Sequence, residues 1–212
     1  CKIDFNYKVI KQENWNAIWE SDFQPITIGN KCGIRADFHE PLELDHEIII
    51  TPKMSFGTGH HATTYGMIEA MLSLDFKEKK VLDMGCGTGV LAILANQLGS
   101  NMVVAIDIEE WAYNNALENI SMNGSSNIVV HKGGKEKIEG EFDIILANIN
   151  RNILIQDMYV YSTHLLHYGL ILFSGFYEQD LDLIKQEAKR HGLKFISHNS
   201  KNNWVTAKFQ KL

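Results

Sequence analysis

Residues 81–93, VLDMGCGTGVLAI, constrain the fold of this chain more than any other stretch. A short apolar run ends in Asp83 and Met84, glycines follow at positions 85, 87 and 89, and a second apolar run comes next. A strand that turns through closely spaced glycines into a helix opens many α/β sheets and brings the backbone close to a ligand. The stretch therefore predicts an α/β fold whose first turn holds something against its main chain.

The chain after this stretch alternates short apolar runs with helical periodicity, which is typical of βα units and a parallel sheet. Residues 193–200 and 202–211 then alternate apolar and polar side chains around a Ser-Lys-Asn-Asn turn, which predicts a terminal antiparallel hairpin. We predict five earlier strands and four helices, at residues 81–85, 102–107, 127–131, 142–148 and 169–175 for the strands and 89–99, 109–123, 152–167 and 178–192 for the helices.

The residues before position 51 have a different character. Residues 12–22 predict a short amphipathic helix with Trp15 and Trp19 on one face, packed on the main domain. Three short strands are expected at 26–29, 32–37 and 47–51. We therefore expect residues 1–50 to form a linker helix and lead-in strands, and residues 51–212 to form the main domain. Because the chain begins with Cys1, we expect a fragment or a processed chain.

The amino-acid composition limits the class of protein, the kinds of ligand and the cellular compartment that fit this chain. Hydrophobic residues make up 45% and charged residues 22% of the 212 residues, which fits a folded globular protein. A net charge of −6 argues against direct binding of nucleic acid. The three cysteines and nine histidines show no metal-ligand spacing, so we expect no metal site. Unpaired cysteines, and no apolar run long enough for a membrane span, favour the cytoplasm.

The spacing of the glycines separates two ligand classes, dinucleotides and S-adenosylmethionine. A dinucleotide site requires Gly-x-Gly-x-x-Gly, whereas Val90 stands where the third glycine would be. Asp83 comes two residues before Gly85, where a carboxylate would repel a pyrophosphate and attract the ammonium and sulfonium groups of S-adenosylmethionine. The alternative for Asp83 is a structural one, in which it caps the turn through backbone N–H groups.

Two strand ends supply further candidates. Asp107 follows Gly85 by 22 residues and can accept hydrogen bonds from ribose hydroxyls, with Glu109 as a less favoured helper. Asn148 ends the fourth strand, where its side-chain amide can accept a hydrogen bond from a substrate amine and leave the amine lone pair free to attack a methyl group. The alternative for Asn148 is that it only forms a turn.

These features resemble class I S-adenosylmethionine-dependent methyltransferases. Residues 51–64, TPKMSFGTGHHATT, indicate one family among these enzymes. The stretch is similar to the segment that precedes the catalytic core in the ribosomal protein L11 methyltransferase (PrmA) family, which reads Asp-Pro-Gly-x-Ala-Phe-Gly-Thr-Gly-x-His-x-Thr-Thr. The Trp-bearing linker and the Ala-Asn-Ile sequence at residues 147–149 match as well. The matching positions in the first stretch are Pro52, Phe56, Gly57, Thr58, Gly59, His61, Thr63 and Thr64.

The resemblance implies a mostly parallel seven-stranded sheet with a terminal antiparallel hairpin and helices on both faces. It also implies S-adenosylmethionine as cofactor and methylation of lysine and N-terminal amines of a large-subunit ribosomal protein, free or on the ribosome. By the family pattern, Thr64, Gly85, Asp107 and Asn148 contact the cofactor, and residues 56–59 form a flexible flap above it. The expected site residues are therefore catalytic Asn148 and cofactor-binding Phe56, Thr64, Asp83, Gly85, Gly87, Asp107 and Asn148.

The chain departs from the family pattern at several positions. Thr51 and Lys53 replace the leading Asp and Gly, and Asn150 replaces the usual Leu. Residues 131–137, HKGGKEK, lack the acid that commonly meets the adenine amino group, which leaves the adenine contacts open. The family also carries an N-terminal substrate-recognition domain, which we expect to be missing from this chain.

Other roles and functions stay open on the sequence alone. We expect His61 to be hydrogen-bonded within the flap hinge and Cys86 to pack as a small apolar residue, and no general base is evident. The alternatives to protein methylation are N-methylation of a small-molecule amine or a nucleic-acid base, and a non-catalytic module that binds S-adenosylmethionine. We expect a monomer that has no membrane contact.

Overall fold

The computed structural model describes residues 23–53 and 56–212. The helix predicted at residues 12–22 lies outside these described residues. The strands are β1 (Ile26–Ile28), β2 (Cys32–Ala36), β3 (His46–Ile50), β4 (Lys80–Met84), β5 (Met102–Asp107), β6 (Ile128–Lys132), β7 (Phe142–Asn148), β8 (Leu165–Tyr177), β9 (Leu193–Lys201) and β10 (Trp204–Lys211). The helices are α2 (Ala62–Met71), α3 (Val90–Gln97), α4 (Glu110–Met122), α5 (Arg151–His164) and α6 (Leu181–Arg190), with single 3₁₀ turns η1 (Lys135–Lys137) and η2 (Glu178–Asp180).

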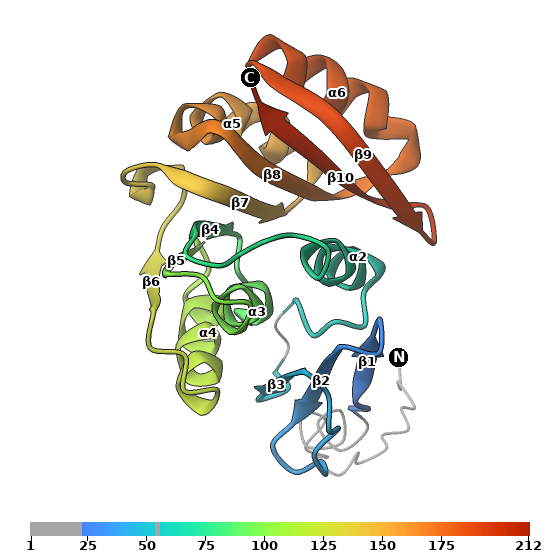
Figure 1. The fold of residues 1–212 in the computed structure, drawn as a ribbon, viewed down its shortest axis with the longest axis vertical. Helices are drawn as coiled ribbons and strands as arrows, with labels where there is room; N and C mark the ends of the chain where they lie inside the picture. Colours follow the sequence, from blue (N-terminus) through green and yellow to red (C-terminus); the bar gives the residue numbers. More distant parts are fainter. Residues whose placement is uncertain (1–22, 54–55) are drawn as a thin grey trace, which may run out of the picture.

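Seven strands form the main sheet in the order β6-β5-β4-β7-β8-β10-β9 (Figure 1). The strands from β6 to β8 pair in parallel, and β10 runs antiparallel to both of its neighbours, β8 and β9. The order reverses between β4 and β7, because the chain first builds outwards through β5 and β6 and then returns to the other side of β4. This switch point is where open α/β sheets bind their ligands. The predicted seven-stranded sheet with a terminal hairpin is confirmed.

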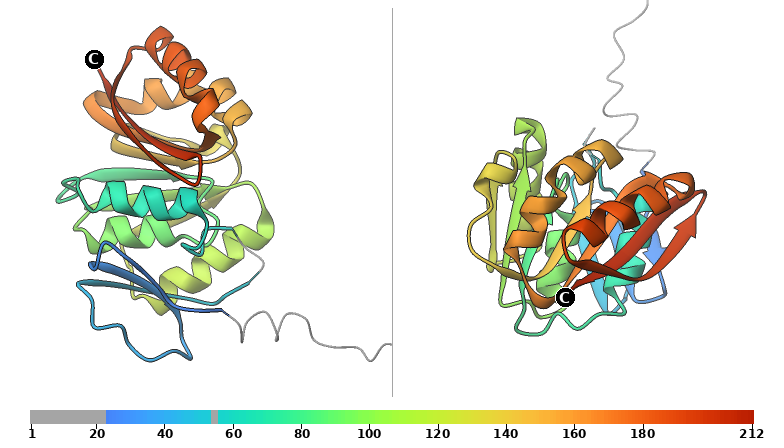
Figure 2. Two further views of the ribbon diagram at one scale, coloured as in Figure 1. Left: turned by 90° about the vertical axis from the view of Figure 1, so that its right-hand side faces the viewer. Right: turned by 90° about the horizontal axis from the view of Figure 1, so that it is seen from above.

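Helices cover both faces of the sheet, as predicted. Helices α2, α3 and α4 lie on one face and α5 and α6 on the other (Figures 1 and 2). Each face buries its own apolar cluster, one that includes Val81, Val103 and Leu146 and one that includes Leu82, Ile145 and Phe173. Because successive residues of β4 alternate between the two clusters, the strand is buried on both faces, which explains its unbroken apolar sequence.

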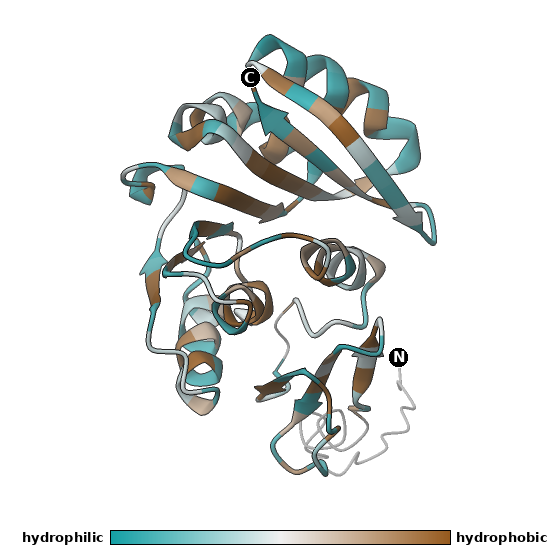
Figure 3. Ribbon diagram, viewed as in Figure 1, coloured by the Kyte–Doolittle hydropathy of each residue, from teal (hydrophilic) through white to brown (hydrophobic). Residues whose placement is uncertain are grey.

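The helices differ in how much of their surface they bury. All of the first six residues of α3 are buried, and in Figure 3 this helix is brown almost throughout. Helix α6 buries only Leu181, Ile184 and Ala188 and presents charged residues elsewhere, so it is largely teal. A helix buried on all sides carries apolar residues all round, whereas an outer helix needs only one apolar stripe. The glycine turn therefore leads into a helix whose first six residues are all enclosed by the protein.

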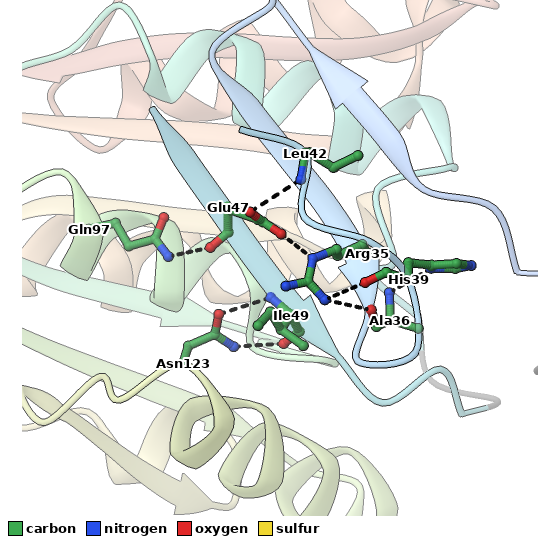
Figure 4. Close-up of polar contacts among 8 residues, drawn as sticks. All are labelled: Arg35, Ala36, His39, Leu42, Glu47, Ile49, Gln97 and Asn123. Carbon is green, nitrogen blue, oxygen red and sulfur yellow. Dashed lines mark hydrogen bonds and ion pairs between the residues drawn. The ribbon is translucent and has the colours of Figure 1, made fainter. Parts of the chain in front are cut away.

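The lead-in strands form a separate three-stranded sheet in the order β1-β2-β3, and all three strands predicted there are present. This sheet packs beside α3 and α4 through side-chain amides (Figure 4). Asn123 accepts a hydrogen bond from the Ile49 N–H at 2.9 Å and donates one to the Ile49 carbonyl, and Gln97 donates to the Glu47 carbonyl at 2.7 Å. Arg35 and Glu47 form an ion pair that joins β2 to β3.

The structure corrects two of the predicted helices. The helix predicted at 152–167 ends at His164, because the chain from Leu165 onward already belongs to β8, which is longer than predicted. The helix predicted at 178–192 is divided into the 3₁₀ turn η2 and helix α6. Helix α2 follows the flap segment and was not predicted as a separate element. None of the helices among the described residues is long and apolar enough to cross a membrane.

Candidate active site

A cavity of about 450 Å³ opens at the carboxyl ends of β4, β5 and β7, at the switch point of the sheet. This volume is in the range of small-molecule sites in proteins. Among the predicted site residues, Phe56, Gly85, Gly87, Asp107 and Asn148 line it. The cavity therefore gathers residues from the flap segment, the glycine turn and two strand ends, which are up to 92 positions apart in the sequence.

The glycine turn depends on backbone conformations that other residues rarely adopt. Gly85 has φ 71° and Gly87 has φ 54°, both in the left-handed region. A Cβ atom on Gly85 would collide with the Ile149 side chain, and one on Gly87 would collide with the Phe56 carbonyl oxygen. Both glycines are therefore required by the close approach of the strand end after β7 and of the flap segment.

Asp107 organises this turn from the end of β5. Its Oδ2 accepts a hydrogen bond from the Gly87 N–H at 2.8 Å, and its Oδ1 accepts one from the Glu109 N–H at 3.0 Å. Each carboxylate oxygen can accept a second hydrogen bond. Asp107 can therefore hold the turn in place and at the same time accept hydrogen bonds from hydroxyl groups in the cavity.

Asp83 is more deeply buried than Asp107. Its side chain is fully buried, and its Oδ2 accepts a hydrogen bond from the Ala92 N–H in α3 at 3.1 Å. Burial raises the pKa of Asp83 to about 7, the Ala92 hydrogen bond opposes this rise, and the nearby Asp107 adds to it. Asp83 therefore stabilises the first turn of α3 through Oδ2. Its Oδ1, behind the glycine turn, has no hydrogen-bond partner among the described residues.

Asn148 and Thr64 meet at the edge of the cavity. The Asn148 Nδ2 donates to the Thr64 Oγ1 at 3.3 Å, and this contact joins β7 to α2. The Asn148 Oδ1 is buried and has no hydrogen-bond partner among the described residues. A buried acceptor without a partner is costly, and such groups in native proteins often mark a ligand contact. The side chain is thus oriented by one bond and keeps its carbonyl oxygen available.

The flap segment is tied to the glycine turn. The Phe56 carbonyl accepts a hydrogen bond from the Thr88 N–H at 3.1 Å, and the Thr88 hydroxyl donates to the Gly57 carbonyl at 2.8 Å. His61 caps α2, because its Nδ1 accepts from the Thr63 N–H at 3.3 Å. The Phe56 side chain is 49% exposed although it lines the cavity, so this ring faces both the site and the solvent.

Sequence reasoning missed the far wall of the cavity. Ile108 and Trp111 line it and are 70% and 50% exposed, and Asp157 of α5 forms an ion pair with Lys135 at 2.5 Å. Apolar residues at the first and fourth positions after the strand-end acid were the available signal for Ile108 and Trp111. Asp157 had no such signal, because its place depends on how α5 packs.

Glu136 also lines the cavity, so the segment after β6 does contain an acid. Its Oε1 accepts a hydrogen bond from the Gly134 N–H at 2.8 Å, and this bond holds the pKa of Glu136 below its usual value. Cys86 is buried, and burial together with Asp83 and Asp107 raises its pKa well above the ordinary value, so the thiol stays protonated. Over residues 23–53 and 56–212, no three His, Cys, Asp or Glu side chains are grouped as metal ligands.

Comparisons with known proteins agree with this geometry. The family model described as ribosomal protein L11 methyltransferase (PrmA) matches residues 1–212. The chain is 46% identical over 212 residues to the ribosomal protein L11 methyltransferase of Phocaeicola vulgatus, which covers 98% of this chain and 75% of that protein. It is 44% identical over 213 residues to that of Bacteroides fragilis, covering 98% of this chain and 76% of the relative.

A solved structure extends the likeness to three dimensions. The crystal structure of a ribosomal protein L11 methylase from Lactobacillus delbrueckii subsp. bulgaricus superposes with a TM-score of 0.82 and 28% sequence identity. The match covers 90% of this chain and 100% of that one. Sequence and fold therefore give the same assignment over nearly the whole chain.

Proposed function

Because this chain belongs to the ribosomal protein L11 methyltransferase (PrmA) family, we propose that it transfers a methyl group from S-adenosylmethionine to an amino group of ribosomal protein L11. The chain is a methyltransferase with the class I fold, and the cofactor contacts and the acceptor are the parts that we propose. The acceptor is a lysine side chain or an N-terminal amine.

The described residues fit the cofactor. Asp107 would accept hydrogen bonds from the ribose hydroxyls, Gly85 and Gly87 would lie against the methionine part, and Thr64, Phe56 and Asn148 would enclose the reactive end. In its ionised form, Asp83 would favour the cationic groups from behind the turn, because a carboxylate stabilises a nearby positive charge. The free Oδ1 atoms of Asp83 and Asn148 support this proposal, since both are polar atoms for which a ligand would supply the missing partner.

One observation carries the proposal, namely the buried carbonyl oxygen of Asn148. Asn148 lines the cavity, and the Thr64 contact to Nδ2 leaves its Oδ1 as an acceptor without a partner among the described residues. An amine N–H that donates to this oxygen keeps the nitrogen lone pair free and directed. Fixing the attacking atom in this way lowers the barrier through proximity and orientation.

The chemistry follows from these positions. S-adenosylmethionine, when bound, supplies an electrophilic methyl group on a sulfonium centre. A free lysine has a pKa of about 10.4, so the acceptor must first release a proton to solvent. The apolar walls of the site disfavour the ammonium form and lower that pKa. The nitrogen lone pair then forms the new N–C bond while the electron pair of the broken S–C bond stays on sulfur. Asn148 holds the nitrogen throughout.

The remaining expectations are part of the proposal. Residues 51–212 would form the catalytic domain, and residues 1–50 would form a linker helix and lead-in strands. The enzyme would act as a monomer in the cytoplasm, on the ribosomal protein free or within the ribosome, without direct contact to nucleic acid. The packing of the β1-β2-β3 sheet beside α3 and α4 supports this arrangement, because it gives the lead-in a fixed place next to the catalytic fold.

Replacement of Asn148 by Ala tests the proposal. We expect kcat for methylation of ribosomal protein L11 to fall by roughly a hundredfold or more, because the attacking nitrogen loses its orientation. The dissociation constant of S-adenosylmethionine, measured by calorimetry, should change by less than about tenfold. Methyl transfer is followed by mass spectrometry of the acceptor.

Asn152→Ala is the matched control, since Asn152 is an exposed residue of α5 only four positions away. Activity in this control should equal that of the wild type. A wild-type chain that binds S-adenosylmethionine but leaves ribosomal protein L11 unmodified would rule out the proposed acceptor. Equal kcat for Asn148→Ala and the wild type would rule out the role of Asn148.

A further inference from the structure

A second cavity lies at the end of α2 that is remote from the candidate active site. Thr64, the partner of Asn148, is in the first turn of α2, whereas the second cavity begins in the last turn of this helix. Its volume is about 250 Å³, and its opposite wall is the antiparallel part of the main sheet. We call it the α2–β10 pocket; its polar lining includes Glu69, Ser73, Ser197, Asn199, Thr206 and Lys208.

The pocket forms where helix α2 ends on the sheet. Gly66 packs so closely on β10 that a Cβ atom there would lie 2.5 Å from the Thr206 Oγ1. From this contact the helix continues to Met71, about 7.5 Å further, whereas the strand continues to Lys211, about 17 Å further. The strand therefore extends beyond the helix that packs on it, which leaves room for a ligand beside the helix end.

The strands present polar side chains to this pocket, although their other side is apolar. The residues of β10 that belong to the apolar cluster beneath α5 and α6 are Val205, Ala207 and Phe209. The alternate residues Thr206 and Lys208 therefore face α2. On the neighbouring strand β9, Asn199 lies opposite Thr206, and Ser197 lies opposite Lys208. Four polar side chains thus stand together where a helix-covered sheet is normally apolar, which suits a polar ligand.

The two walls of the pocket carry opposite charges. Glu69 contributes a carboxylate from α2, and Lys208 contributes an ammonium group from β10. Within residues 23–53 and 56–212, neither side chain forms an ion pair or a hydrogen bond with another side chain. Lys208 is also partly buried, so its ammonium group has lost some of its water without gaining a counter-charge. A ligand that carries both charges would complete both interactions.

The position of Glu69 in the helix also favours a cation. Glu69 belongs to the last turn of α2, and no residue of this turn is basic. The carboxyl end of a helix carries a partial negative charge, so an acid there is unfavourable and a nearby cation is favourable. A ligand ammonium group beside Glu69 would therefore interact with the carboxylate and with the helix end together.

The size of the pocket limits the ligand to a small molecule. Drug-sized ligands occupy pockets of about 300–1,000 Å³, and this pocket is smaller. We propose that the α2–β10 pocket binds a small polar α-amino acid, with its ammonium group at Glu69 and its carboxylate at Lys208. Ser197 and Asn199 contact the polar side chain of this ligand. The inference goes beyond the methyltransferase reaction, since no step of that reaction passes through the pocket.

A set of three matched probes tests the proposal. L-serine carries both charges, ethanolamine lacks the carboxylate, and 3-hydroxypropionate lacks the ammonium group. Each is titrated into the protein, and binding is followed by NMR through the backbone amide signals of Ala70 and Lys208. We expect L-serine to bind with a dissociation constant of about 1–10 mM. The other two probes should bind at least about fivefold more weakly, because each leaves one charged wall without a partner.

Two variants remove one charge each and keep the size of the side chain. In Glu69→Gln, L-serine should bind no more tightly than 3-hydroxypropionate, because its ammonium group has lost its partner. In Lys208→Gln, it should bind no more tightly than ethanolamine for the matching reason. Glu139→Gln and Lys189→Gln are the controls, since both residues are exposed and lie outside the pocket. Both controls should bind L-serine like the wild type.

The location of the signals separates this pocket from the candidate active site. S-adenosylmethionine itself contains an amino-acid group, so the amide signals of Gly85 and Gly87 report any probe that enters the cofactor cavity. The proposal is overturned if L-serine moves these two signals instead of those of Ala70 and Lys208, or if no signal shows saturable binding. It is also overturned if Glu69→Gln and Lys208→Gln bind L-serine as tightly as their controls. None of these measurements depends on methyl transfer.

Discussion

The two halves of the main sheet differ in how much of their strands they bury. In the parallel half, β4 and β5 are buried over nearly their whole length, and the cavity is shaped by the backbone of the glycine turn. In the antiparallel half, β9 buries only Leu193, and Tyr177 at the end of β8 is exposed as well. The parallel half therefore depends on main-chain geometry at the glycine turn, whereas the antiparallel half presents side chains to solvent.

This difference predicts that the two halves tolerate substitution differently. A change in the glycine turn has to be accommodated by the strands and helix packed around it, because protein interiors leave little free space. A change on the outer face of the hairpin or of α6 meets solvent. The following four predictions test this contrast, from the largest expected effect to the smallest.

Gly87→Ala should have the largest effect. The added Cβ would need left-handed backbone at φ 54° and would collide with the Phe56 carbonyl oxygen. We expect a loss of about 2–4 kcal/mol in the free energy of unfolding. The affinity for S-adenosylmethionine should fall by about a hundredfold or more, since the turn can no longer approach the ligand. Urea unfolding and calorimetric titration measure the two effects.

Gly124→Ala separates strain from contact. Gly124 has φ 61°, but an added Cβ would meet nothing within 4 Å. This variant should lose only about 1–2 kcal/mol and keep its cofactor affinity. Equal losses in Gly87→Ala and Gly124→Ala would show that the close approach of the flap segment does not matter.

Asp83→Asn should change the pH dependence of stability. The folded state holds the Asp83 proton up to about pH 7, whereas an unfolded aspartate releases it near pH 3.9. The resulting stabilisation is complete below about pH 4 and is lost as the pH rises to about 7, by about 4 kcal/mol in total. Asparagine does not ionise and still accepts from the Ala92 N–H. The cofactor-free variant should therefore be more stable than the wild type at pH 8, as measured by urea unfolding.

The control for this prediction is Asp75→Asn. Asp75 is exposed, and its carboxylate accepts only a turn hydrogen bond from the Lys77 N–H. Its variant should follow the wild-type pH profile. The assignment of the slope to Asp83 fails if Asp83→Asn also keeps the wild-type profile between pH 4 and 8.

Asp107→Ala should weaken S-adenosylmethionine binding by roughly tenfold to a hundredfold, because the carboxylate holds the Gly87 N–H and would meet the ribose. Glu110→Ala is the control, since Glu110 is an exposed acid three residues later whose Lys132 partner is also exposed. Calorimetry of both variants measures the effect. If both lose the same affinity, general negative charge at this edge would explain binding better than Asp107 itself.

Asp182→Ala on α6 should have the smallest effect. Its contact with Lys185 is an exposed ion pair at 3.6 Å, and such pairs contribute little. We expect the Tm to change by less than about 2 °C in a thermal unfolding experiment. Lys185→Ala should cost more, because the Lys185 Nζ also lies 4.4 Å from the centroid of the Phe195 ring. A larger loss from Asp182→Ala would contradict the view that the outer surface of this half is tolerant.

Part of the candidate site was predictable because its signals are local. The glycine spacing, the acid at the end of β5 and the amide at the end of β7 follow from short patterns, and parallel strands bring their carboxyl ends to one edge. The contribution of Glu136 and Asp157 was not predictable. Their places depend on how the connection after β6 and helix α5 pack around the cavity, and no repeating pattern encodes this.

The sequence by itself determined the strand order along the chain, the terminal hairpin and the glycine turn. Apolar periodicity and glycine conformation act over a few residues, so a short segment is enough to read them. Only the tertiary structure decided which side chains face each other across the site. Asn148 lies opposite Ser174, and Tyr177 lies opposite Trp204, 27 residues later, because of strand register. Register is fixed by packing over the whole sheet, so the contact between the Tyr177 and Trp204 rings exists only once the fold is complete.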